Sequence, residues 1–218
     1  MTRLIKILIT GTALTILPLN LAFADGSTDG TGSNVLNGQI DFQVTSANLN
    51  TTINNVNGTV ANTSSAVGNN LEVVTMDNTV VTNKQYVSGV SIAADQNATV
   101  TNVSGTVNLQ SQAICNAADV STDPHVAAVA SNQDCNSNDP SSLLNANVAN
   151  IGNDVTLGAT SIGNNFSEDT NAATMPVQNI QTNNANIAAT VNSTVYNVNG
   201  TVSVNSSAIG NNAQIVHY

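Results

Sequence analysis

Basic and aromatic side chains are scarce in this chain. Its 218 residues contain three Lys and Arg residues against 13 Asp and Glu, and they contain no Trp. Two of the three bases lie within the first six residues, so Lys84 is the only strong base in the rest of the chain. A protein with this charge balance repels nucleic acid and anionic membrane surfaces. We therefore expect no nucleic-acid partner and no insertion into a lipid bilayer.

The residue types on which catalysis depends are also few. Beyond the first six residues the chain has one Lys, no Arg and two His, which are His125 and His217. This leaves little material for a general base, an activated nucleophile or a group that stabilises an oxyanion. The Asp residues share no position in the repeat described below, and no His and Cys occur at metal-ligand spacing. We expect no enzymatic activity, no catalytic residue, no cofactor and no metal site.

Long apolar runs are absent except at the start of the chain. Residues 1–24 combine a short basic region, an apolar stretch and the small-x-small sequence Ala22-Phe23-Ala24. This order is typical of a cleavable signal peptide, so the mature chain should begin at Asp25. No later run approaches the roughly 20 apolar residues that cross a bilayer. We expect a protein that a Gram-negative bacterium secretes or displays at its cell surface.

Cys115 and Cys135 are the only cysteines. In an exported protein an even number of cysteines predicts a disulfide. The alternative is a metal site, but His125 and His217 do not supply ligands at a suitable spacing. The predicted bridge would hold the most irregular part of the chain, where residues 131–142 are expected to form a loop.

An internal repeat organises residues 38–218, whereas residues 25–37 carry no phase and are expected to form a flexible N-terminal tail. Four segments align without gaps, at intervals of 47, 48 and 47 residues (103 − 56, 151 − 103 and 198 − 151). Apolar and polar residues alternate within each segment, which predicts strands with one buried face. The chain should therefore be an all-β solenoid of stacked rungs, built from four repeats of 47–48 residues. Because half a repeat suits a rung of two strands and two turns, we expect about two rungs per repeat. The segments begin at Val56, Val103, Ile151 and Val198.

Two sets of positions follow from the phase of the repeat. Four valines occupy the same place in each copy and should form one inward-facing column: Val60, Val107, Val155 and Val202. Three copies then carry Gly-Asn-Asn, and both residue types tolerate positive φ, so these tripeptides should form tight turns or solenoid corners. Equivalent Asn side chains could hydrogen-bond from rung to rung as ladders. The predicted corners are Gly68, Asn69, Asn70, Gly163, Asn164, Asn165, Gly210, Asn211 and Asn212.

The last copy, residues 202–218, resembles the curlin repeat of bacterial extracellular amyloid fibres. It shares the alternation of Ser, Val and Asn through a strand, the Gly-Asn-Asn segment and the strand that resumes at Ala213. The Ala-Ile-Gly-Asn motif also resembles the repeats of holdfast-attachment proteins. This chain differs from curlin in its cysteines, its doubled repeat length and its few Gln in phase. The resemblance implies a β-solenoid that outer-membrane secretion machinery exports and that joins a surface fibre or anchor.

Two functions remain open at this point. The first is a structural subunit of an amyloid-like fibre or a cell-surface anchor, which assembles by β-stacking of its solenoid ends on itself or on sibling subunits. Open solenoid ends present unpaired backbone groups that can template another chain. The alternative is a monomeric surface adhesin that binds carbohydrate. An exposed aromatic row would favour it, but the aromatic residues after the leader share no repeat phase: Phe42, Tyr86, Phe166, Tyr196 and Tyr218.

Overall fold

The computed structural model describes residues 33–218, except residues 77, 123–127, 138 and 173. The expected signal peptide, residues 25–32 of the expected tail, and His125 lie outside the described residues. The described chain forms strands throughout: β1 (Ser33–Asp41), β2 (Thr45–Val56), β3 (Val60–Thr75), β4 (Thr79–Ser88), β5 (Ile92–Val103), β6 (Val107–Thr122), β7 (Ala128–Asn136), β8 (Ser141–Ile151), β9 (Val155–Thr170), β10 (Val177–Asn183), β11 (Ala188–Val198) and β12 (Val202–His217).

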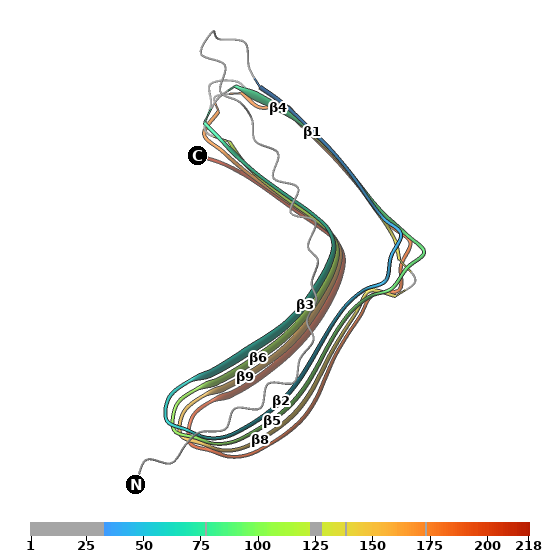
Figure 1. Cartoon of the computed structure of the whole chain (residues 1–218). Helices are drawn as coiled ribbons and strands as arrows, with labels where there is room; N and C mark the ends of the chain where they lie inside the picture. Colours follow the sequence, from blue (N-terminus) through green and yellow to red (C-terminus); the bar gives the residue numbers. More distant parts are fainter. Residues whose placement is uncertain (1–32, 77, 123–127, 138, 173) are drawn as a thin grey trace.

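The strands stack into three parallel four-stranded sheets, as Figure 1 shows down the stack. Face 1 has the order β1-β4-β7-β10, face 2 the order β2-β5-β8-β11, and face 3 the order β3-β6-β9-β12. Each strand pairs with the strand one repeat away, so rungs 1 to 4 are β1–β3, β4–β6, β7–β9 and β10–β12. The prediction of an all-β solenoid built from four repeats is confirmed.

The prediction of two rungs per repeat is wrong. Val107 pairs with Val60 on one side and with Val155 on the other, so one repeat makes one rung of three strands. The sequence between successive motif copies is not a degenerate second rung. It supplies the end of the face 3 strand, the face 1 strand and nearly all of the face 2 strand, and strands of up to 16 residues use the whole repeat length.

Regular pairing extends further than the composition indicated. Strand β1 begins at Ser33, which pairs with Thr79, so the part of the expected tail from Ser33 onward is a strand. Strand β7 runs to Asn136 and β8 begins at Ser141, so most of the loop expected at residues 131–142 is also β-structure. In both places polar side chains form hydrogen bonds with side chains of the neighbouring rung, as Asn37 does with Asn83 and Gln133 with Gln85. The predictions of a tail and a loop considered only the polarity of each segment, so they missed these bonds.

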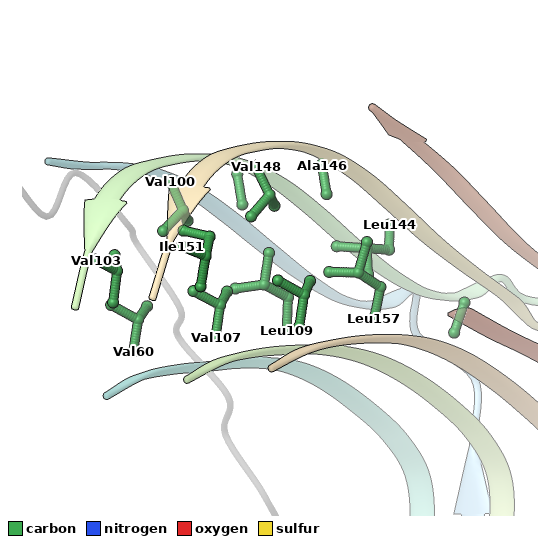
Figure 2. Packing of buried hydrophobic residues seen from close by; sticks show 13 residues of the cluster. Val60, Val100, Val103, Val107, Leu109, Leu144, Ala146, Val148, Ile151 and Leu157 are labelled. Atoms are coloured by element: carbon green, nitrogen blue, oxygen red, sulfur yellow. The ribbon is translucent and has the colours of Figure 1, made fainter. Parts of the chain in front are cut away.

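The long strands of face 3 change their buried side partway along. In β3 the buried parity is that of Val60 up to Gly68, and then that of Asn69 onward, because Gly68 and Asn69 are both buried. Regular pairing also skips Gly68, since Val67 and Asn69 have register partners and Gly68 has none. The first half of each face 3 strand therefore packs on face 2, and the second half packs on face 1. Figure 2 shows the first of these cores.

The tight turns lie at a different motif from the one predicted. The Gly-Asn-Asn tripeptides lie inside β3, β9 and β12, where the strand bends without ending. Backbone angles in the left-handed region occur instead near the end of each face 2 strand, before the turn to face 3, and at Gly89 (φ 62°) in the turn between β4 and β5. Asn and Gly are the residues that adopt such angles at least cost. The four Asn, each with φ between 55° and 60°, are Asn55, Asn102, Asn150 and Asn197.

Candidate functional site: the ends and side-chain ladders of the solenoid

The four valines of the expected column pair one above another on face 3. Val107 and Val155 are fully buried and Val60 is nearly so, within a core that includes Leu109 of β6. Val202, in rung 4, is 45% exposed. The column therefore runs through the whole stack and opens to solvent at its C-terminal end.

Other inward positions of rung 4 are open in the same way. Val204 is 51% exposed, whereas Leu157, its partner in β9, is fully buried. Ile215 is 53% exposed and lies over Glu168, which is fully buried. At the opposite end of the stack, Val73 of rung 1 is only 4% exposed. The apolar interior is thus uncovered at the rung formed by β10, β11 and β12, and each of these strands is one of the two edge strands of its sheet.

The predicted disulfide is confirmed, because Cys115 and Cys135 are bonded. Both cysteines are fully buried, and the bond joins β6 of rung 2 to β7 of rung 3. Cys115 stands where the other copies have glycine, at the point where the face 3 strand bends. At Gly68 an added Cβ would lie 2.7 Å from the carbonyl oxygen of Cys115, so the stack leaves little room for side chains here.

A ladder of buried asparagines follows directly after this bend. Asn69 donates from Nδ2 to Oδ1 of Asn116, Asn116 donates to Asn164, and Asn164 donates to Asn211, each at 2.8 Å. The first three side chains are buried. The middle residue of each Gly-Asn-Asn tripeptide therefore points into the core and links the rungs. Its role is a rung-to-rung hydrogen bond and not a turn conformation.

A second ladder, of glutamines, lies on face 1. Gln85 donates from Nε2 to Oε1 of Gln39, Gln133 donates to Gln85, and Gln181 donates to Gln133, at 2.8 to 2.9 Å. This ladder was not among the features predicted from the sequence. Its signal was present, because these four Gln recur at intervals of 46, 48 and 48 residues (85 − 39, 133 − 85 and 181 − 133).

Glu168 is the one carboxylate placed in the interior of the described stack. It shares its inward column with Val73, Val120 and Ile215. Neither carboxyl oxygen has a hydrogen-bond partner among the described residues. Burial, followed by the nearby carboxylates of Asp169 and Asp119, raises the pKa of Glu168 to about 8. This side chain is therefore protonated over much of the pH range in which an ordinary Glu is charged.

The outer surface of face 2 carries a shallow groove of about 870 Å3 that crosses all four rungs. An exposed Asn ladder borders it, in which Asn97 donates to Asn50, Asn145 to Asn97, and Asn192 to Asn145. The groove is lined by uncharged residues, chiefly Asn, Thr, Ser and Ala. It offers repeated amide and hydroxyl groups along the stack and no aromatic side chain.

His217 lies near the end of β12, where its Nε2 lies 2.7 Å from the carbonyl oxygen of Ala172. No group of three potential metal ligands occurs in the described ranges. In the same part of the chain no helix is long and apolar enough to cross a membrane.

The sequence of this chain matches the model of one protein family. The model of holdfast attachment protein D matches residues 54–218, which include β3 of rung 1 and all of rungs 2 to 4. The chain belongs to the holdfast attachment protein D family. Comparisons with curated proteins and with solved structures gave no significant match.

Membership of the holdfast attachment protein D family indicates a role in attachment at the cell surface. It agrees with the family resemblance that the Ala-Ile-Gly-Asn motif carries. The matched region includes the open C-terminal rung and both ends of the disulfide.

Proposed function

We propose that this chain is an exported structural subunit of the holdfast attachment apparatus, which joins its neighbours by amyloid-like β-stacking at the ends of the solenoid. In this proposal a cleavable signal peptide and outer-membrane secretion machinery deliver it, and its partners are further copies of itself or sibling anchor subunits. The role is mechanical and involves no catalysis.

The open C-terminal rung is the observation that carries this proposal. Val202, Val204 and Ile215 expose about half of their surface, although their equivalents in rung 3 are buried. An apolar interior that ends in solvent is stabilised when another rung covers it. The free backbone groups of β10, β11 and β12 would pair at the same time.

The test places a charge on this rung and the same charge on the flank of the solenoid. Val204→Lys leaves the lysine in solvent in the single chain, but stacking would bury an unpaired ammonium group, which costs several kcal/mol. Val74→Lys is the matched control, because Val74 is 73% exposed on the outer side of β3.

We expect Val204→Lys to reduce surface attachment of cells more than tenfold and Val74→Lys to leave it unchanged. Both proteins should retain the β-sheet circular dichroism spectrum of the parent. Normal attachment with Val204→Lys would contradict a function that depends on the open rung.

The groove on face 2 favours a second candidate, the monomeric adhesin. The groove repeats uncharged hydrogen-bond donors and acceptors, such as Asn97 and Asn145. Such groups can form hydrogen bonds with the hydroxyl groups of a neutral polysaccharide. Under this candidate, Asn97→Ala together with Asn145→Ala would weaken binding of the purified protein to neutral glycans, while Val204→Lys would not. The two variants therefore separate the two candidates.

A further inference from the structure

The hydrogen bonds of the side-chain ladders have a fixed direction along the stack. In the glutamine ladder every amide nitrogen donates toward the N-terminal rung, from Gln181 down to Gln39. In the buried asparagine ladder every amide nitrogen donates toward the C-terminal rung, from Asn69 up to Asn211. The two ladders therefore run in opposite directions, and each end of the solenoid carries one donor and one acceptor.

Backbone contacts fix which amide atom is the nitrogen. Each glutamine uses its second N–H to reach a carbonyl oxygen of its own rung, as Gln133 does at Asn165 and Gln181 does at Asn212, both at 2.9 Å. In the asparagine ladder, Asn164 of rung 3 donates to the carbonyl oxygen of Thr182 in rung 4 at 2.7 Å. A rotated amide would place oxygen against oxygen at these contacts, so the direction of each ladder follows from its chemistry.

The two ends consequently differ and match each other. At rung 1, Gln39 has one N–H left after its bond to the carbonyl oxygen of Asn70, and Oδ1 of Asn69 accepts no bond among the described contacts. At rung 4, Oε1 of Gln181 accepts no bond in the same set, and Asn211 has an N–H beyond its contact with the carbonyl oxygen of Gln181. A donor and an acceptor at one end thus correspond to an acceptor and a donor at the other.

We propose that the partner of the open C-terminal rung is a second copy of this chain, whose rung 1 stacks head to tail on rung 4 in the register of the internal repeat. This proposal rests on the proposed function and names the occupant of the same surface. In the stack, Gln39 of the incoming copy donates to Gln181, and Asn211 donates to the incoming Asn69. Each ladder continues from copy to copy with the direction it has inside one chain.

The apolar columns and the exposed ladder extend in the same register. Val60 and Val73 of the incoming copy would lie against Val202 and Ile215, which repeats the pairing of internal rungs. Val60 and Val73 are themselves buried in rung 1, so the two ends of the described stack differ in exposure. On the outer surface, Asn50 of the incoming copy would donate to Oδ1 of Asn192, which accepts no bond among the described contacts of the single chain.

Contact between two C-terminal ends does not give these bonds. Two copies related by a two-fold axis across the stack would have antiparallel strands, whereas the strand pairs inside the chain are parallel, so neither the register nor the Gln-to-Gln and Asn-to-Asn ladders would continue. A head-to-tail contact is heterologous, so it leaves one end free after every addition and produces an open-ended assembly.

The experiment blocks one end at a time in the purified, disulfide-bonded protein. Val204→Lys blocks the C-terminal end, and Val202→Lys is a second variant with the same purpose. Gln39→Glu blocks the N-terminal end, because a carboxylate then faces the acceptor Gln181. Asn50→Asp is its second variant, since Asn50 is exposed and its acceptor oxygen is kept for Asn97. Circular dichroism establishes that each variant is folded, and sedimentation velocity measures its size.

We expect the parent to form long assemblies and each blocked variant alone to remain monomeric. A mixture of one C-blocked and one N-blocked variant should form dimers and nothing larger, because one intact end of each kind remains. Folded N-blocked protein that assembles like the parent would overturn the proposal, and so would a mixture that stays monomeric. If the parent stays monomeric in isolation while Val204→Lys abolishes attachment of cells, the proposed function stands and the partner is a different chain. If Val204→Lys leaves attachment intact, the proposed function itself fails.

Discussion

The buried carboxyl group of Glu168 makes stability depend on pH in a direction that the structure fixes. Its pKa rises from 4.5 to about 8 in the folded chain because burial, and then the charges of Asp169 and Asp119, oppose ionisation. The folded state therefore holds this proton more tightly than the unfolded state does. Its contribution to stability is fully present below pH 4.5, declines as the pH rises, and is lost once the pH passes about 8.

The size of the effect follows from the interval between the two pKa values. Each pH unit between 4.5 and 8 lowers the free energy of unfolding by about 1.4 kcal/mol, so the whole interval amounts to about 5 kcal/mol. By pH 7 about 3 kcal/mol of this has been lost. Since Glu168 lies under Ile215, the C-terminal rung should loosen first when the group ionises.

Urea unfolding of the disulfide-bonded protein at pH 5, 6, 7 and 8 measures this slope in the parent and in Glu168→Gln. The variant cannot ionise here, so the parent should lose about 1.4 kcal/mol per pH unit relative to it. Glu72→Gln is the control, because Glu72 is exposed on β3 and its removal should leave the parent's slope unchanged. Equal slopes for the parent and Glu168→Gln would refute the argument that a buried, unpaired carboxyl controls stability.

Two further predictions concern the links between rungs. Replacing both Cys115 and Cys135 with Ala should lower the free energy of unfolding by about 3 kcal/mol, because the bond spans a sequence separation of 20 residues. An unchanged urea midpoint would show that the bond adds nothing to the stability of the stacked rungs. Asn116→Ala should lower the free energy of unfolding by about 2 kcal/mol, because it leaves Oδ1 of Asn164 buried without a donor. Asn97→Ala, in the exposed ladder, should change the free energy of unfolding by no more than about 0.5 kcal/mol. Equal losses in these two variants would mean that burial of the ladder has no energetic consequence.

The repeat period was the part of the fold that the sequence predicted best. Val60 and its equivalents recur in phase, and alternation around them indicates strands, so both the solenoid and the stacking register could be expected before the structure was known. The disulfide was also predictable, since an exported chain with only two cysteines has one possible pairing. These features depend on residue identity and spacing alone.

The number of rungs and the position of the turns could not be derived in the same way. Face 1 strands such as β4 carry Thr, Asn and Gln, whose burial depends on partners 46 to 48 residues away. Local polarity made these segments look like degenerate rungs or loops. The Gly-Asn-Asn segment was also ambiguous, because Asn serves both in turns with positive φ and in buried ladders, and Asn55 and Asn69 illustrate the two cases. Only the three-dimensional register distinguishes them.

The scarcity of charge in this chain follows from stacking by translation. Each inward or outward position meets its equivalent one rung away, about 4.8 Å along the stack. A side-chain amide can donate a hydrogen bond to the rung on one side and accept one from the rung on the other. A column of Asn or Gln can therefore form hydrogen bonds at every rung of the stack. A repeated carboxylate or ammonium would instead face its own charge, at roughly 1 to 4 kcal/mol per pair depending on burial. Glu168 is tolerated because its neighbours in the column, Val120 and Ile215, are apolar and it stays protonated. In the proposed junction between copies the same rule would hold, because Gln181 and Asn211 would meet Gln39 and Asn69 of the next chain without any charge.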